Sequence, residues 1–177
     1  MTIFYAVLAF VALQRGGELV LARANTRRLM QAGAVEIDRG GYKWFVLLHA
    51  AWLVALLATV PAATPPNWAL LALFFTLQAG RIWVIASLDR RWTTRLIVLP
   101  SAPLVASGPY RWLGHPNYLI VLGEVAILPL AFAAVAIAVG FSACNLILLA
   151  RRIRLENHAL DRPSYHIRET LPRRNQL

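Results

Sequence analysis

The sequence predicts an all-α integral membrane protein with about five transmembrane helices, the last two of which form a tight hairpin. The 177 residues are 59% hydrophobic, and the mean hydropathy is +0.57. Long apolar runs alternate with segments that are rich in arginine. A soluble domain of this size lacks the interior for so much apolar surface, so we expect the excess to face lipid.

The first three spans follow directly from the apolar runs. Residues 2–22 form the first span, residues 44–60 the second and residues 68–88 the third, with a proline-rich turn before the third. No basic segment precedes the first run and no small-residue cleavage site follows it, which argues against a signal peptide.

The last apolar run, residues 119–150, is too long for a single span. As one helix it would extend about 48 Å, whereas the hydrocarbon core of a bilayer is about 30 Å thick. We therefore expect a bend near Pro129, with spans at 118–130 and 131–150 and a tail helix at 151–162. The whole chain, 1–177, is predicted to form one domain, with a functional loop at 101–118.

The charged residues support this arrangement. The net charge is +10, and most of the arginines lie in the loops 23–43 and 89–115 and in the tail, which five spans place on one side. By the positive-inside rule the N-terminus is outside and the C-terminus cytoplasmic. Because the basic residues flank apolar spans, we expect contacts with membrane lipid and none with nucleic acid. A bacterial inner membrane with a site facing the cytoplasm is the expected location.

Each predicted span also carries a polar residue at a similar depth. At 1.5 Å per residue, these residues lie roughly 6–10 Å inside the cytoplasmic ends of their helices. They are Arg15, Glu18, His49, Arg81, Glu124 and Asn145. We predict a polar pocket that opens to the cytoplasm. The alternative is internal pairing, of Arg15 with Glu18 and of Arg81 with Glu124, that holds the helices together.

Two polar segments stand out next to the spans. In Ser107-Gly-Pro-Tyr-Arg-Trp-Leu-Gly-His115-Pro-Asn-Tyr118, a helix starting at His115-Pro116 offers free backbone N–H groups to an anion. The alternative is an aromatic anchor at the membrane surface with a helix cap at Asn117. In the tail, Arg152 and Glu156 share one helix face, as a surface pair or as a lid over a pocket. The single cysteine, Cys144, lies in an apolar run, and no metal site is predicted.

These segments resemble the isoprenylcysteine carboxyl methyltransferase family. The resemblance rests on Leu104-Val-Ala-Ser-Gly-Pro-Tyr110, on His115-Pro-Asn-Tyr118 and on Arg152-Ile-Arg-Leu-Glu156-Asn-His-Ala-Leu160, and it covers roughly residues 81–160. The first half, with Arg15-Gly-Gly-Glu-Leu and Ala24-Asn-Thr-Arg-Arg, looks similar to a bacterial branch. Members of that branch accompany type III polyketide synthases and O-methylate alkylpyrones or alkylresorcinols.

The resemblance implies an enzyme that uses S-adenosylmethionine without a Rossmann domain, and the chain contains no G-x-G fingerprint. It implies a methyl acceptor that is a lipophilic small molecule or a prenylated substrate, methylated on an oxygen. The implied cofactor-binding residues are Pro103, Leu104, Val105, Tyr110, His115, Pro116, Asn117, Tyr118 and Glu156. Arg152 falls where the family has an arginine facing the acceptor. With Arg152, the catalytic candidates are Glu124, His49 and Arg81 from the polar layer, and a phenolic acceptor would use a base among Glu18, His49 and Glu124.

Two positions depart from the family pattern. Gly114 stands where an arginine usually precedes His-Pro, and Asn157 stands where the tail motif usually has a second glutamate. A non-catalytic scaffold or lipid-binding relative that has lost the cofactor is therefore the alternative function. A nicotinamide-dependent reductase with similar C-terminal patterning is a third. The sequence does not determine the acceptor or the oligomeric state.

Overall fold

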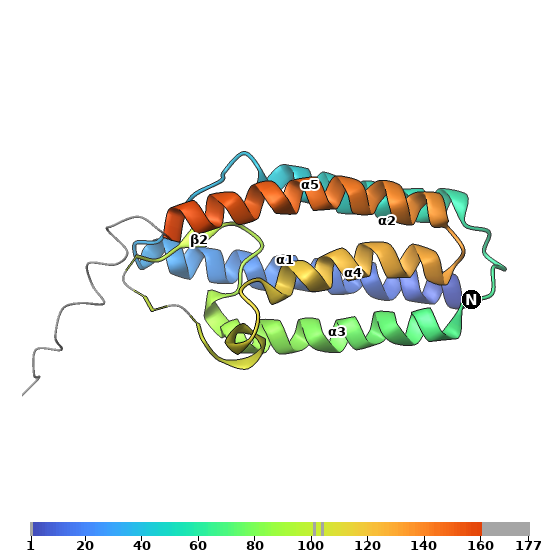
Figure 1. Ribbon diagram of the computed structural model, residues 1–177, viewed down its shortest axis with the longest axis horizontal. Coiled ribbons are helices and arrows are strands. Elements are labelled where there is room, and N and C mark those ends of the chain that lie inside the picture. Colours follow the sequence, from blue (N-terminus) through green and yellow to red (C-terminus); the bar gives the residue numbers. More distant parts are fainter. Residues whose placement is uncertain (1, 101, 104, 161–177) are drawn as a thin grey trace, which may run out of the picture.

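The computed structural model describes residues 2–100, 102–103 and 105–160, and it is a bundle of α-helices (Figure 1). In chain order the helices are α1 (Ile3–Gln31), α2 (Tyr42–Thr59), α3 (Trp68–Leu88), α4 (Pro116–Ala131) and α5 (Val135–Leu160). Short 3-10 helices, η1 (Asp89–Arg91) and η2 (Gly108–Arg111), shape the segment between α3 and α4. The predicted helical class is therefore confirmed.

The lengths of the helices bear on how the chain meets the membrane. Within the described residues, the helices α1, α2, α3 and α5 are long and apolar enough to cross a bilayer. Helix α4 has 16 residues, and at about 24 Å it is shorter than a hydrocarbon core of about 30 Å. Apolar side chains such as Leu13 and Ile147 are exposed on the helix surfaces, as lipid contact requires. The chain is thus an integral membrane protein, while five complete spans and their orientation stay predictions.

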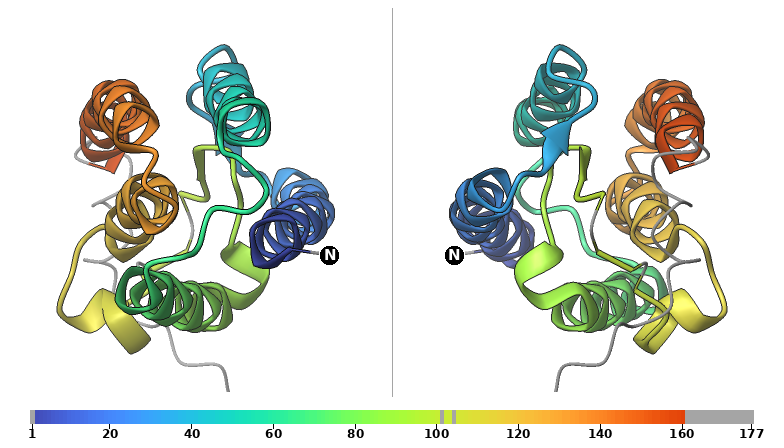
Figure 2. Two further views of the ribbon diagram at one scale, coloured as in Figure 1. Left: turned by 90° about the vertical axis from the view of Figure 1, so that its right-hand side faces the viewer. Right: turned by 90° about the vertical axis from the view of Figure 1, so that its left-hand side faces the viewer.

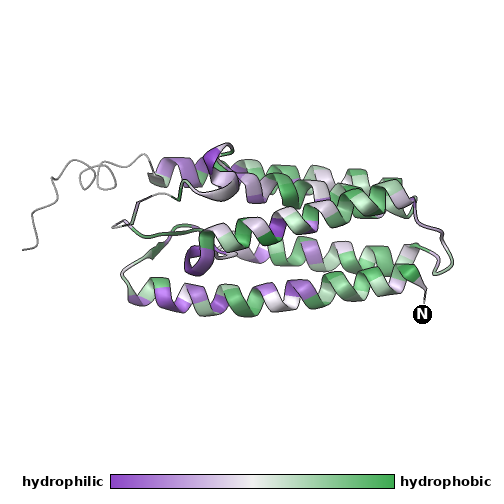
Figure 3. Cartoon of the chain, turned by 90° about the horizontal axis from the view of Figure 1, so that it is seen from below, coloured by the Kyte–Doolittle hydropathy of each residue, from purple (hydrophilic) through white to green (hydrophobic). Residues whose placement is uncertain are grey.

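The bundle has an apolar end and a polar end. Helix α4 packs between α3 and α5, and α2 packs against α5 (Figure 2). Around the N-terminal end of α1, the side chains of Phe4, Trp52, Leu56, Phe74 and Leu128 form a buried apolar core. Hydrophilic residues gather at the opposite end, where α5 ends (Figure 3). The loops that carry the family-like motifs lie at that polar end.

Helix α1 is longer than predicted. The prediction ended the first span near residue 22, but α1 continues to Gln31. Its extension is held by Asn25, which is 2% exposed and donates from Nδ2 to the backbone carbonyls of Asp89 at 3.2 Å and Trp92 at 2.9 Å. Because these partners are distant in sequence, the apolar pattern alone did not indicate the extension.

The last two helices form the expected hairpin. Pro129 lies in the last turn of α4, and Ala133 turns the chain with a φ of 58°. The N–H of Ala134 donates to the carbonyl of Pro129 at 2.9 Å and closes the turn. The predicted tail helix is not separate, because α5 continues without a break from Val135 to Leu160. Residues 161–162 of that prediction lie outside the described part of the chain.

A small sheet joins two loops at the polar end. Strand β1 (Val35–Glu36) pairs antiparallel with β2 (Ile97–Val98), with Val35 opposite Val98 and Glu36 opposite Ile97. Two-residue strands carry too little alternation to be recognised in a sequence. The sheet connects the α1–α2 loop to the α3–α4 loop and so fixes residues near 96–98 beside the end of α1.

Candidate functional site

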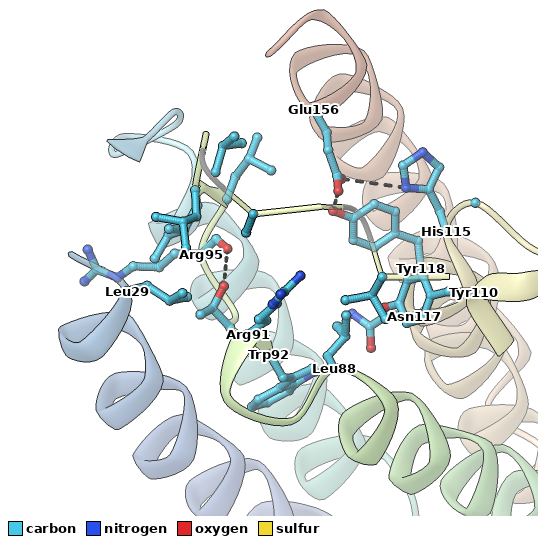
Figure 4. Close-up of a pocket in the computed structure, with 18 of the residues that line it drawn as sticks. Leu29, Leu88, Arg91, Trp92, Arg95, Tyr110, His115, Asn117, Tyr118 and Glu156 are labelled. Atoms are coloured by element: carbon cyan, nitrogen blue, oxygen red, sulfur yellow. Dashed lines mark hydrogen bonds and ion pairs between the residues drawn. The ribbon is translucent and has the colours of Figure 1, made fainter. Parts of the chain in front are cut away.

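A cavity of about 550 Å³ opens at the polar end of the bundle. It lies between the ends of α1 and α3, the start of α4 and the end of α5 (Figure 4). Its lining comprises Leu29, Leu88, Arg91, Trp92, Thr93, Arg95, Leu96, Ile97, Val98, Leu99, Ala102, Pro103, Val105, Ala106, Tyr110, Gly114, His115, Asn117, Tyr118, Arg152, Glu156 and Asn157. Mixed apolar and polar walls of this kind, around about 300–1,000 Å³, are typical of small-molecule sites.

Tyr118 connects the two family-like motifs. Its hydroxyl donates to Glu156 Oε2 at 2.6 Å and accepts a hydrogen bond from Arg152 Nε at 3.0 Å. Arg152 Nη1 also donates to the backbone carbonyl of Thr94 at 2.9 Å. Arg152 and Glu156 are four residues apart and so lie on one face of α5. This chain of hydrogen bonds holds α5, the start of α4 and the α3–α4 loop around one cavity.

Aromatic and cationic groups surround the same tyrosine. The ring of His115 stacks on that of Tyr118, with centroids 5.3 Å apart and planes at 15°, and His115 Nδ1 lies 3.7 Å from Glu156 Oε2. The guanidinium carbon of Arg152 is 5.6 Å from the Tyr118 ring and 5.3 Å from the ring of Phe45. Such cation–π contacts fix the orientation of the guanidinium in addition to its hydrogen bonds.

Tyr110 provides a hydroxyl that stays protonated. Burial, followed by the negative charge of Glu156, raises the pKa of Tyr110 to about 12. Both causes disfavour the phenolate, because the anion would lose hydration and face a like charge. Tyr110 is therefore a neutral hydrogen-bond donor at any physiological pH.

Two polar atoms near the cavity lack a partner. Asn117 Oδ1 and Trp92 Nε1 are buried and make no hydrogen bond within the described part of the chain, and both residues line the cavity. Buried polar groups are nearly always satisfied, so each of these two atoms needs a partner beyond the described residues, either a bound water or a ligand.

Arginines of the α3–α4 loop give the cavity a positive rim. Arg91 Nη1 donates to the backbone carbonyl of Pro103 at 2.6 Å. Arg95 is paired with both carboxylate oxygens of Glu36 at 3.1 Å and lies over the ring of Tyr42. The sequence interpretation missed Arg91, Trp92 and Arg95 because it used this loop only to assign topology. Apolar residues next to the arginines, here Trp92 and Leu96, were the available signal in the sequence, and both are buried.

The polar layer is present, but it is closed by ion pairs. Arg15 contacts Glu18 at 2.9 Å and also pairs with Glu124. Arg81 donates to Glu18 at 2.6 Å and to Glu124 at 3.3 Å. These two arginines and two glutamates form a network, called here the ion-pair network, that joins α1, α3 and α4. The internal pairing that the sequence left open is therefore found, with cross-pairs in addition to the two expected ones.

The predicted site residues divide between the cavity and this network. Of the implied cofactor residues, the cavity lining includes Pro103, Val105, Tyr110, His115, Asn117, Tyr118 and Glu156. Pro116 is the buried first residue of α4 and is not among the lining residues given above, and Leu104 lies outside the described residues. Arg152 lines the cavity, whereas Arg81 and Glu124 belong to the ion-pair network. His49 bonds through Nδ1 to the carbonyl of Phe45 in its own helix at 2.8 Å. The catalytic roles of these four residues stay predictions.

Comparison with known proteins places this geometry in a family. The model of the isoprenylcysteine carboxyl methyltransferase (ICMT) family matches residues 70–162, the segment that supplies most of the cavity. The chain belongs to the ICMT family. It is also 34% identical over 161 residues to the uncharacterized protein YpbQ of Bacillus subtilis (strain 168), covering 89% of this chain and 96% of that relative. No solved structure matches the chain.

Membership of the ICMT family indicates an integral membrane methyltransferase, and it confirms the resemblance at the level of the family. The two departures from the family pattern, Gly114 and Asn157, both lie in the cavity wall. A Cβ atom at Gly114 would meet no heavy atom within 4 Å. The position therefore has open space for at least the first atom of a side chain.

Proposed function

We propose that this ICMT family member uses S-adenosylmethionine to methylate an oxygen of a lipophilic acceptor at the cavity. The observation that carries the proposal is the convergence of Glu156, Tyr118, His115 and Arg152 on one cavity wall. Residues from two segments that are distant in sequence are joined there by direct hydrogen bonds. The adjoining Asn117 and Trp92 also carry buried polar atoms without a partner among the described residues.

The residues present suit the proposed cofactor. S-adenosylmethionine carries a sulfonium, an ammonium and ribose hydroxyls, so it needs carboxylate and amide acceptors. Glu156 and the unpaired Asn117 Oδ1 supply these acceptors. Trp92 Nε1 and the neutral hydroxyl of Tyr110 are donors for a ring nitrogen or a carboxylate. Pro103 and Val105 would cover an apolar face, and the aromatic rings of His115 and Tyr118 would attract positive charge.

When bound, S-adenosylmethionine supplies a methyl group that is already activated on sulfur. The protein is then required mainly to position the acceptor and to exclude water. Arg152 is held on three sides by Tyr118, Thr94 and Phe45, which suits it to orient an anionic oxygen. A carboxylate or an acidic enol needs no base. For a phenol, His49 and Glu124 are the proposed bases, with Arg81 as the ion partner of Glu124. None of the three is among the residues that line the cavity, so this role requires the acceptor to reach from the cavity into the polar layer.

The acceptor and the location belong to the same proposal. The exposed apolar faces of the helices favour a lipid-like acceptor, and the first half of the chain favours an alkylpyrone or alkylresorcinol as in the polyketide-associated branch. A prenylated substrate is the alternative acceptor. We place the protein in a bacterial inner membrane with the cavity on the cytoplasmic side, in contact with membrane lipid and without a nucleic acid partner.

Titration with S-adenosylhomocysteine tests the proposal. The purified protein in detergent should show saturable binding by calorimetry, and Glu156→Gln should weaken it by at least about tenfold, the effect of one charge-assisted hydrogen bond. Asp38→Asn is the matched control, because it alters the ion pair of Asp38 with Arg151 beside the cavity and should leave binding unchanged.

The outcomes separate the two functions that remain. Folded protein without any binding would favour the non-catalytic lipid-binding relative, because Gly114 and Asn157 both stand where the family usually has a charged side chain. Binding that is insensitive to Glu156→Gln would contradict the assigned site.

A further inference from the structure

The interior of the bundle contains a second set of unsatisfied polar atoms. They lie on all five helices, are buried, and make no hydrogen bond within the described residues. They are Gln14 Oε1, Arg15 Nε, Trp52 Nε1, Gln78 Nε2, Glu124 Oε1, Ser142 Oγ, and Asn145 Nδ2 and Oδ1. In a bilayer, where bulk water cannot reach the interior, each such atom strongly disfavours the folded state unless a partner is bound.

Hydrogen bonds and ion pairs bring the members from α1, α3 and α4 together. Gln14 Nε2 donates to Gln78 Oε1 at 2.7 Å and to Glu18 Oε1 at 3.1 Å. Glu18 in turn belongs to the ion-pair network, which reaches Arg15 and Glu124. The unsatisfied atoms of Gln14, Arg15, Gln78 and Glu124 therefore surround one network.

The register of the helices brings Trp52 and Asn145 to the same level. Helices α2 and α5 run antiparallel side by side (Figure 1), and Arg152 lies over the ring of Phe45. Seven residues are about two helical turns, so Trp52 and Asn145, each seven residues from that contact, face each other about 10 Å deeper in the bundle.

A similar register argument connects α5 to the network. Arg152 also bonds to Tyr118 at the start of α4, and α4 and α5 are antiparallel in their hairpin. Counting seven residues along each helix from this contact places Asn145 opposite residue 125, next to Glu124. Ser142 is one turn from Asn145 on the same face. All eight unsatisfied atoms thus lie within about two helical turns of one level.

The chemistry of these atoms defines what would satisfy them. Four are N–H donors, on Arg15, Trp52, Gln78 and Asn145, three are carbonyl or carboxylate acceptors, and the hydroxyl of Ser142 can serve as either. The charges of the ion-pair network cancel, with two arginines against two glutamates. A neutral oxygen that both donates and accepts, as in a hydroxyl, matches this set better than an ion.

The position of the cluster indicates where such a group comes from. Asn145 and Glu124 are 0% exposed, but Gln14 and Arg15 are only half-buried. Next to them along α1, Leu13 and Gly16 are exposed at a depth that the bilayer surrounds. The side of the cluster on α1 is therefore the side nearest to the surrounding lipid.

We propose that this interior polar cluster is a second binding site, distinct from the cavity at the polar end, for the hydroxyl group of a neutral amphiphile drawn from the membrane. The site is formed by Gln14, Gln78, Asn145 and Trp52 around the ion-pair network. It does not depend on methyl transfer, and it exists whether or not the end cavity holds a cofactor.

A long-chain alcohol and the matching alkane test the site. Delipidated protein in detergent is titrated with 1-dodecanol or dodecane, and the thermal unfolding temperature is recorded. We expect a saturable increase with dodecanol that exceeds any increase with dodecane. Asn145→Leu, which keeps the branching at Cγ and has no polar atoms, should weaken the dodecanol response by about tenfold, as expected for the loss of one hydrogen bond.

Two further variants make the test specific. Trp52→Phe removes the indole N–H while keeping an aromatic ring, and it should act in the same direction if Asn145→Leu fails to fold. Thr76→Val is the matched control, because its exposed hydroxyl bonds to the carbonyl of Ala72 in its own helix and should not change the response. The response to S-adenosylhomocysteine, which reports on the end cavity, should be the same in all three variants.

Equal responses to dodecanol and dodecane, or an unchanged dodecanol response in both Asn145→Leu and Trp52→Phe, would overturn the site and leave water as the partner of these atoms.

Discussion

The hydroxyl of Tyr118 offers the sharpest test of how the cavity is organised. Tyr118→Phe removes one oxygen atom, which bonds to Glu156 at 2.6 Å and to Arg152 at 3.0 Å. The ring remains, so its stacking on His115 should be preserved. The variant thus isolates the hydrogen-bond chain between α4 and α5.

The size of the effect follows from the two lost bonds. A hydrogen bond to a charged partner contributes about 1.5–3 kcal/mol, so two bonds at the lower value give about 3 kcal/mol. The Glu156 side chain is 25% exposed, and water will replace part of the loss. We therefore expect about half of that total, near 1.5 kcal/mol, to remain as a net loss. Because an unrestrained Glu156 must be ordered when a ligand binds, this loss should appear in affinity, as roughly a tenfold higher Kd.

Calorimetric titration with S-adenosylhomocysteine measures this difference. The control is Tyr5→Phe, since Tyr5 is an exposed tyrosine of α1 near the opposite end of the bundle. A Kd for Tyr118→Phe within about twofold of the wild type, with the unfolding temperature unchanged, would show that Glu156 is positioned without Tyr118. That result would refute the reasoning.

Three other outcomes are expected. Glu124→Gln leaves the negative charge of the ion-pair network short of its two arginines and should destabilise the protein by about 3–5 kcal/mol. Adding Arg81→Met should recover part of this lost stability, measured by thermal unfolding, and no recovery would argue against coupling of Arg81 with Glu124. The difference in absorbance at 295 nm between wild type and Tyr110→Phe should titrate near the raised pKa of about 12. Because this tyrosine ionises near pH 10 in an unfolded chain, the stability of the protein should fall as the pH rises between these two values. A titration midpoint near pH 10 would contradict the burial argument. Gly114→Arg places a cation in open space at the cavity wall. It should raise the affinity for S-adenosylhomocysteine by about tenfold without lowering the unfolding temperature. A loss of affinity would mean that this wall does not face an anionic group of the ligand.

The amino-acid sequence by itself determined the helical class and the position of most helices. The third span was predicted at 68–88, and α3 is Trp68–Leu88; the bend near Pro129 was also located correctly. These features are local, because apolar length and turn residues act within a few residues of each other. The motifs around His115 and Glu156 were recognised for the same reason, since each is a short contiguous pattern.

Only the tertiary structure decided how these pieces meet. The extension of α1 depends on Asn25 reaching carbonyls of a distant loop. The cavity acquires Arg91, Trp92 and Arg95 through a sheet of two-residue strands. Neither feature has a local periodic signal.

The polar layer shows the same division. Its depth could be counted along each helix, because the rise per residue is constant. The pair of Arg15 with Glu18 could also be expected, because the two residues are one turn apart on the same helix. The cross-pairs of Arg15 with Glu124 and of Arg81 with Glu18 could not, because they form only after the three helices have packed. The rotation and spacing of whole helices determine which long side chains meet. These are properties of the packed bundle, and no single segment of the sequence contains them.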